Sequence, residues 1–219
     1  MDIKAIITGS TGMVGEGVLH ECLQHPDVKE VLVINRKPCG VKHPKLKEII
    51  HGNFFNMLPV AAQLHGYNAC YFCLGVSSVG MKEDAYEHAT YDLTMEVAKT
   101  LATMNPDMTF CYVSGAGTDR NSMWAKIKKR TENDLQRLPF KAAYMFRPGY
   151  MQPTKGLQRT QSFYKYMSWL YPVLRRVFPQ GVSTLAELGQ AMINVTRYGF
   201  PTKVLEVKDI VQLAHQPQK

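Results

Sequence analysis

Short apolar runs alternate with longer stretches of helical periodicity over the first two thirds of the chain. The apolar runs predict strands over residues 3–8, 30–35, 46–51, 69–74, 109–114 and 141–147. The periodic stretches predict helices over residues 14–24, 57–64, 84–104 and 122–138, the second of them capped by Asn56. Short, mainly apolar strands joined by helices are typical of a parallel sheet covered on both faces. We therefore expect an α/β fold with a doubly wound parallel sheet.

The pattern changes after residue 153. A periodic helix is expected over 184–198 and a short strand over 204–207. The apolar positions of that helix are Leu185, Leu188, Met192 and Val195. No low-complexity linker interrupts the chain, so we expect a single domain, 1–219, with a core over 1–153 and a mostly helical C-terminal extension over 154–219.

Three glycines with the spacing GxxGxxG join the first expected strand to the first expected helix. Gly9 permits a tight turn, Gly12 lets the backbone approach a diphosphate, and Gly15 lets the helix pack closely on the strand. The N–H groups that open the helix then face the phosphates. This context predicts a dinucleotide-binding loop in the core. Its expected contact residues are Gly9, Ser10, Thr11, Gly12, Met13, Val14 and Gly15.

The residues at the end of the second expected strand indicate which dinucleotide the loop binds. NAD-binding loops usually carry a carboxylate there, whereas this chain has Asn35, Arg36 and Lys37. A guanidinium group can bind a 2′-phosphate through two hydrogen bonds. We therefore expect NADP(H) to be favoured over NAD(H), with Arg36 as the residue that distinguishes them.

Composition and charge narrow the classes of partner. The chain has 26 Lys and Arg against 18 Asp and Glu, a net charge of +8, which suits an anionic ligand. No recognised nucleic-acid module accompanies these cations, so no nucleic acid is expected. The seven histidines show no metal-ligand spacing, so no metal site is expected. The five cysteines are odd in number and no signal-type segment precedes them, which favours a cytoplasmic location.

Two local patterns have more than one interpretation. Cys70 and Cys73 form a CxxC, but they lie in an apolar strand where residues three apart point to opposite faces, so we interpret them as buried thiols. The aromatic and basic segment 163–178 is compatible with a cover over the substrate, with peripheral contact to a membrane surface, or with the core of a helical subdomain.

The chain resembles an atypical short-chain dehydrogenase/reductase with a Rossmann-type domain. Within that group it resembles the Tat-interacting (CC3-type) oxidoreductase-like proteins and their uncharacterised bacterial relatives. The motifs that carry this resemblance, in order, are Thr8–Gly15, Asn35-Arg36, Cys73-Leu74-Gly75, Val113–Ala116 and Phe146–Gly149. The resemblance implies further cofactor contacts at Asn53, Phe54, Leu74, Gly75, Val76 and Pro148. It also leaves a homodimer open.

Reductases of this type use a Ser, a Tyr and a Lys, the last two four residues apart on one helix face. Ser114 and Lys128 match the serine and the lysine, and Lys128 would also hold the cofactor ribose. The tyrosine position is Trp124, whose indole N–H has no useful acidity. A water or another tyrosine would have to substitute: Tyr150 follows Pro148-Gly149, and Tyr86 and Tyr91 lie on the helix after the fourth strand.

Three functions remain open from the sequence. The first is an NADP-dependent oxidoreductase that acts on an unknown small organic substrate. The second is an NADPH-binding regulator or sensor that acts on a protein partner without turnover, which Trp124 favours. The third is an epimerase or isomerase of the nucleotide-sugar type.

Overall fold

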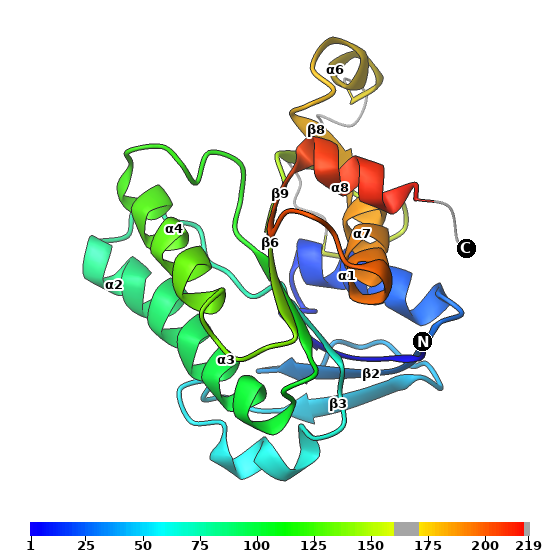
Figure 1. Ribbon diagram of the computed structural model, residues 1–219, viewed down its shortest axis with the longest axis vertical. Helices are drawn as coiled ribbons and strands as arrows, with labels where there is room; N and C mark the ends of the chain where they lie inside the picture. Colours follow the sequence, from blue (N-terminus) through cyan, green and yellow to red (C-terminus); the bar gives the residue numbers. More distant parts are fainter. Residues whose placement is uncertain (160–170, 217–219) are drawn as a thin grey trace.

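Seven parallel strands form the central sheet of the computed structural model, which describes residues 1–159 and 171–216 (Figure 1). The strands are β1 (Ile3–Thr8), β2 (Val28–Asn35), β3 (Leu46–Ile50), β4 (Ala69–Phe72), β5 (Thr109–Val113), β6 (Ala142–Arg147) and β9 (Val204–Glu206). Their order across the sheet is β3-β2-β1-β4-β5-β6-β9. The Rossmann-type, doubly wound sheet expected from the sequence is therefore confirmed, with β9 as its seventh strand.

Helices cover both faces of the sheet (Figure 1). One face carries α1 (Met13–Gln24), α7 (Leu185–Tyr198) and α8 (Val207–Ala214); the other carries α2 (Glu83–Glu87), the π-helical turn η2 (His88–Asp92), α3 (Leu93–Met104) and α4 (Met123–Leu135). Each face has its own apolar core. Successive residues of β1 illustrate this, because Ile7 packs with the α1 and α7 side and Ile6 with the α3 side.

Two expected helices differ from the prediction. The one at 57–64 is a 3-10 helix, η1 (Leu58–Gln63), with Met57 rather than Asn56 at its cap position. Asn56 still accepts the Leu58 N–H at 3.2 Å, as a turn residue before the cap. The helix expected over 84–104 is divided into α2, η2 and α3 by the π-helical turn. Because π-helical turns are rare and short, an expectation of regular α-helical periodicity over 84–104 does not include one.

The C-terminal third adds elements that the sequence pattern did not predict. β7 (Tyr150–Gln152) pairs in parallel with β8 (Val182–Thr184), outside the main sheet. α8 begins directly after β9, so the expected strand over 204–207 was one residue too long. A hydrogen bond from the Glu206 N–H to Asp209 Oδ2, at 3.0 Å, opens that helix. The expected helix over 184–198 is confirmed, and its four apolar positions are all buried.

The aromatic and basic segment is described in part. Residues 163–170 lie outside the described residues. The remainder forms α6 (Tyr171–Val177), which stands away from the body of the molecule in Figure 1 and contributes no buried side chain. Val173, Val177 and Phe178 are exposed there. For this part of the segment, the interpretation as the core of a helical subdomain is therefore wrong.

The extension packs on the core at close range. α7 lies on α1, where a Cβ added at Gly17 would lie 2.9 Å from the Leu185 Cβ. The β9 strand pairs with β6 and so extends the main sheet. Residues from both parts of the chain therefore share the apolar core on the α1 and α7 face of the sheet.

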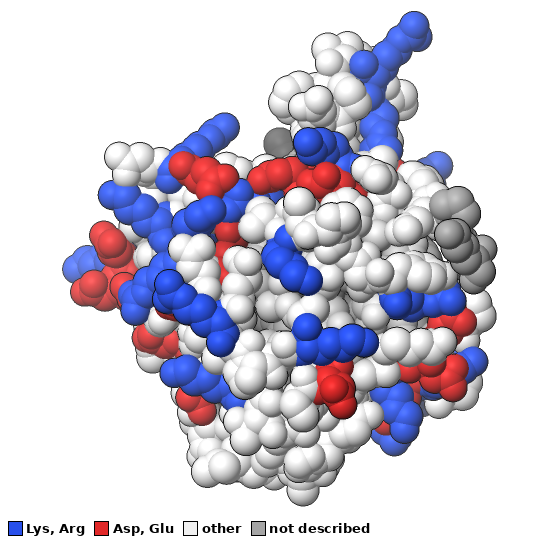
Figure 2. Space-filling model, in the orientation of Figure 1, with Lys and Arg blue, Asp and Glu red and all other residues white. Residues whose placement is uncertain are grey.

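Charge is distributed rather than concentrated on the face drawn in Figure 2. Lys and Arg side chains are spread over it, and groups of Asp and Glu lie between them. On this face the surplus of eight positive charges makes no continuous basic track.

Candidate functional site

The glycine loop lies where the strand order of the sheet reverses, between β1 and β4. Ligands of doubly wound sheets bind in the crevice that forms at this point. Gly9 has φ +74°, and a Cβ there would lie 2.8 Å from the Cys73 backbone carbonyl. A Cβ at Gly15 would lie 2.2 Å from the Gly9 carbonyl oxygen. Gly15 is therefore required for packing within the loop, rather than against a strand as expected.

A pocket of about 260 Å³ opens above this loop. Of the expected contact residues it is lined by Gly9, Thr11, Gly12, Asn35, Arg36, Phe54, Leu74, Gly75 and Val76. Ile34 and Cys73 complete the lining. At Gly12, the cap of α1, an added Cβ would meet only the Gly9 carbonyl oxygen, at 3.4 Å. A polar chain can therefore approach the first N–H groups of α1 closely, which is what a dinucleotide diphosphate requires.

Other expected contact residues play structural roles. The Ser10 hydroxyl is buried and donates to Asn35 Oδ1 at 2.9 Å. The side chains of Met13 and Val14 pack against the apolar core, so only their backbone N–H groups can reach a phosphate. Asn53 accepts the Phe55 N–H at 3.1 Å in a turn outside the pocket lining.

Pro148 is buried, and it too lies outside that lining. Its carbonyl oxygen accepts the Ala116 N–H at 2.9 Å, which joins the segments that follow β5 and β6. The expectation that Pro148 contacts the cofactor therefore finds no counterpart in this pocket.

A carboxylate that the sequence analysis missed lies at the end of β2. Glu48 on β3 accepts the Asn35 side-chain amide and the Cys39 backbone N–H, each at 2.8 Å. Pairing of β2 with β3 brings it there. The sequence carries no signal for Glu48 at this position, because the register between β2 and β3 cannot be read from it. Arg36 is exposed on the pocket beside this group and carries the opposite charge.

The start of the C-terminal extension is fastened beside the glycine loop. Glu16, in the first turn of α1, accepts the Gln158 N–H at 2.9 Å and the Arg159 N–H at 2.7 Å with its two oxygens. This carboxylate therefore holds the extension close to the start of α1, where a diphosphate would bind.

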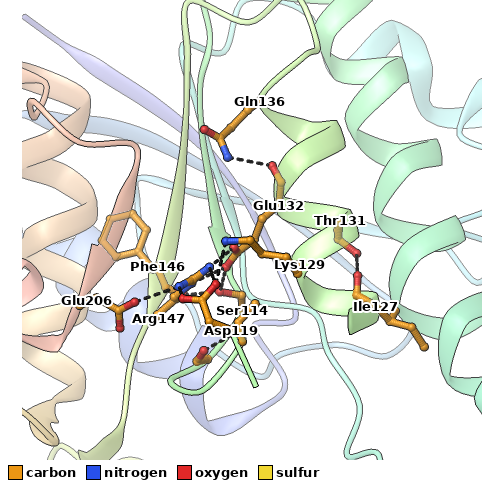
Figure 3. A network of polar contacts seen from close by, with 12 residues as sticks. Ser114, Asp119, Ile127, Lys129, Thr131, Glu132, Gln136, Phe146, Arg147 and Glu206 are labelled. Carbon is orange, nitrogen blue, oxygen red and sulfur yellow. Dashed lines mark hydrogen bonds and ion pairs between the residues drawn. The ribbon is translucent and has the colours of Figure 1, made fainter. Parts of the chain in front are cut away.

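Ser114 belongs to a buried ionic network (Figure 3). Its hydroxyl donates to Glu132 Oε1 at 2.6 Å, and Arg147 Nε donates to the same oxygen at 2.9 Å. Arg147 Nη2 donates to the second oxygen at 2.5 Å. The hydrogen bonds to Glu132 raise the pKa of the Arg147 guanidinium, despite the opposing effect of burial. The network therefore holds a permanent ion pair between α4 and β6.

Two further carboxylates bind the same guanidinium from the surface (Figure 3). Asp119 and Glu206 each form an ion pair with Arg147 Nη1, the latter at 3.0 Å. Hydrogen bonds from Lys129 and Arg147 lower the pKa of Asp119. The sequence analysis missed these partners. For Glu132 a signal existed, because it lies four residues after Lys128 and so on the same helix face.

Lys128 directs its ammonium group into the protein, with 7% of the residue exposed. Its Nζ donates to the Val113 carbonyl oxygen at 3.3 Å and lies 4.8 Å from the centre of the Tyr112 ring. Burial lowers the pKa of Lys128, while the charges that Tyr86 and Glu132 can carry oppose that shift. A Cβ built on Gly75 would lie 4.0 Å from Nζ. Lys128 therefore reaches the wall of the glycine-loop pocket.

Trp124 and Tyr150 lie at different places relative to Lys128. Trp124 lies one turn before Lys128 on α4 and is partly exposed. Tyr150 lies on β7, where its hydroxyl donates to Gln152 Oε1 at 3.3 Å, and it is outside the pocket lining. The structure therefore brings Lys128, but not Tyr150, to the glycine-loop pocket.

Within residues 1–159 and 171–216, no cluster of three or more His, Cys, Asp or Glu side chains is arranged to hold a metal ion. No helix in these ranges is both long enough and apolar enough to cross a membrane. Cys70 is buried, and Cys73 is partly buried on the opposite face of the sheet, as expected from their spacing.

Comparison with known proteins gives a family match over most of the core. The model of the NAD dependent epimerase/dehydratase family matches residues 5–139. Leucinostatins biosynthesis cluster protein T of Purpureocillium lilacinum is 30% identical over 138 residues, which cover 61% of this chain and 51% of that protein. Protein fmp52-1, mitochondrial, of Aspergillus oryzae is 26% identical over 151 residues, which cover 65% and 63%. The matches thus span between half and two thirds of these relatives.

Solved structures show the same fold at low identity. A glucuronic acid dehydrogenase from Chromohalobacter salexigens aligns with a TM-score of 0.68 and 14% identity, over 94% of this chain and 76% of that one. The Bordetella bronchiseptica enzyme WbmF in complex with NAD+ aligns with a TM-score of 0.65 and 14% identity, over 97% and 76%.

Proposed function

Because the chain belongs to the NAD dependent epimerase/dehydratase family, we propose that it is an NADP(H)-dependent oxidoreductase of the atypical short-chain type, acting on a small organic substrate. Membership implies a nicotinamide dinucleotide as cofactor. The observation that carries the finer proposal is Arg36, which lines the glycine-loop pocket with its guanidinium exposed. The same proposal makes the protein cytoplasmic and a relative of the Tat-interacting oxidoreductase-like proteins.

The residues of the pocket fit the parts of this cofactor. The N–H groups at the start of α1 would hold the diphosphate, and Arg36 would bind the ribose 2′-phosphate through two hydrogen bonds. Phe54, buried at the pocket wall, would pack against the adenine. Lys128 would donate to the second ribose from the Gly75 side. When bound, the reduced cofactor supplies a hydride.

A binding titration tests the choice of cofactor. We expect NADPH at 100 times its Kd to stabilise the wild type by about 2.7 kcal/mol in thermal melts. Arg36→Ala removes charge-assisted hydrogen bonds to the 2′-phosphate, so NADPH affinity should fall about 10- to 100-fold while NADH affinity stays unchanged.

Lys37→Ala is the matched control, because Lys37 is the adjacent exposed cation and lies outside the pocket lining. It should leave the preference for NADPH intact. Equal losses of NADPH affinity in both variants would mean that general charge, not Arg36, attracts the phosphate. An unchanged melt with either nucleotide would contradict the proposed function itself.

A regulator or sensor without turnover is the second candidate. Trp124 favours it, because the indole at the usual tyrosine position cannot donate a proton to a carbonyl oxygen. Such a protein would bind NADPH through the same residues and pass the redox state of the cofactor to a protein partner. Tight NADPH binding without hydride loss to any carbonyl compound would identify it.

A further inference from the structure

Reduction of a carbonyl needs a proton donor close to the nicotinamide, and two expected positions do not provide one. Ser114 directs its hydroxyl proton to Glu132, which is completely buried and bound by Arg147. Trp124 has only an indole N–H. A side-chain donor would therefore come from another element that approaches Lys128.

Tyr86 meets this requirement. It lies on α2, is 2% exposed, and stands two residues before the start of the π-helical turn η2. α2 and η2 both pack against α4, the helix that carries Lys128. π-Helical turns within helices are frequent at functional sites. Tyr86 is the one buried residue of α2, so its side chain lies on the side of α2 that packs against α4. The charge that Tyr86 can carry also opposes the lowering of the Lys128 pKa.

The other tyrosine of this helical segment is held elsewhere. The Tyr91 hydroxyl donates to Asp134 Oδ2 at 2.8 Å, and its ring lies 3.8 Å from the Arg130 guanidinium carbon. Both partners belong to the outer part of α4, away from the buried Lys128. Tyr86 on α2 and Tyr91 within η2 thus have different surroundings, which makes Tyr91 the matched control for Tyr86.

We propose that Tyr86, acting beside Lys128 from α2, is the acid that replaces the tyrosine missing from position 124 of α4. The proposal rests on the proposed function, because the proton is needed only if a carbonyl is reduced. It restores the pairing of a phenol with an ammonium group by bringing the phenol from a different helix.

The proton balance of this step is complete. As the carbonyl carbon accepts the hydride, the electron pair of the C=O π bond moves to the oxygen. The oxygen then takes the proton of the Tyr86 hydroxyl and becomes an alcohol. Lys128 returns a proton to the Tyr86 phenolate and is itself reprotonated by water. The carbonyl is reduced and NADPH is oxidised to NADP+.

Fluorine NMR tests the placement of Tyr86 without turnover. Protein grown with 3-fluorotyrosine should lose one resonance in Tyr86→Phe and a different one in Tyr91→Phe, which assigns both. We expect the Tyr86 resonance to shift on addition of NADPH and in Lys128→Met, and the Tyr91 resonance to stay in place. A Tyr86 resonance that ignores both changes, in protein that binds NADPH, would overturn the inference and leave the proposed function standing.

Oxidation of NADPH by 9,10-phenanthrenequinone, an activated dicarbonyl, tests the chemical role. Tyr86→Phe should lower kcat at least ~100-fold with unchanged NADPH affinity, and Tyr91→Phe should not. Adding Trp124→Tyr to Tyr86→Phe should recover most of the loss, which a purely structural role would not allow. A Tyr86→Phe variant with the wild-type rate would refute Tyr86 as the acid and leave the proposed function standing. A wild type that binds NADPH but never oxidises it with the quinone would refute both Tyr86 as the acid and the proposed oxidoreductase. Absence of NADPH binding would instead refute the proposed function.

Discussion

Lys128 combines a functional position with an unfavourable environment. Its ammonium group is surrounded by backbone, an aromatic ring and the wall of the pocket, and its described hydrogen bond is to a carbonyl oxygen rather than a carboxylate. Desolvation disfavours the charged form of such a group. A buried group that lowers the stability of the cofactor-free protein is typical of a ligand-binding site.

Replacing that ammonium should therefore stabilise the empty protein. The folded state binds the Lys128 proton more weakly than the unfolded state, whose pKa is near 10.5. We expect Lys128→Met to increase the free energy of unfolding at pH 7 to 8, because the cost of burying the ammonium group is removed. Stability of the wild type rises as the pH increases from the lowered pKa to about 10.5, so the difference between the two proteins should shrink over that window.

Lys126→Met is the control, since Lys126 lies two residues earlier on α4 and is exposed. Urea unfolding should place it within about 0.5 kcal/mol of the wild type. A net loss of stability in Lys128→Met would show that its contacts outweigh its desolvation.

The glycine loop, at the scale of the element, contains two glycines with separable roles. Gly15 leaves space for the Gly9 carbonyl, whereas Gly12 leaves the start of α1 open. Gly15→Ala should destabilise the fold by about 1–3 kcal/mol, because its Cβ would overlap backbone. Gly12→Ala should change stability by less than about 1 kcal/mol, yet abolish NADPH binding. Melts with and without NADPH separate the two effects; equal destabilisation by both variants would contradict the separation.

The network around Arg147 connects α4 and β6 through a buried charge. Glu132→Gln removes the buried partner and leaves the guanidinium uncompensated there, so we expect a loss of about 3 kcal/mol or more. Glu206→Gln is the control, because that side chain is 45% exposed and such pairs contribute about 1 kcal/mol at most. Denaturant titration of both variants measures the difference, and similar small losses would mean that Arg147 is held without a strong contribution from Glu132.

Whether a feature of the site could be predicted from the sequence depends on whether its contacts are local. The glycine loop, Arg36 and the periodic face of α7 were predicted because their signals lie within one element and its neighbour. Glu48, Asp119 and Glu206 were missed because strand register and loop paths bring them to the site. The expectation for Ser10 came from its place in the glycine loop, and those for Asn53 and Pro148 came from the resemblance. Here the polar groups of all three are used within the protein.

The whole molecule depends on its last third for the completion of the core. α7 covers α1, β9 extends the sheet at β6, and Glu16 ties residues 158 and 159 to the glycine loop. We expect a fragment of residues 1–153 to bind a dye for exposed apolar surface and to show no cooperative melt. Mixing it with a 154–219 fragment should restore the melt and NADPH binding. A cooperatively folded 1–153 fragment would show that the core is independent.

The order of α1, β6, α7 and β9 along the chain has a consequence during translation. The glycine loop and α1 leave the ribosome well before α7, the helix that covers α1, and β6 leaves it before its partner β9. Until α7 and β9 follow, the nascent chain displays the apolar face of α1 and the unpaired edge of β6, a surface that chaperones recognise and that neighbouring nascent chains can join. Slow translation between α1 and α7 would therefore prolong the period in which this protein is most open to aggregation.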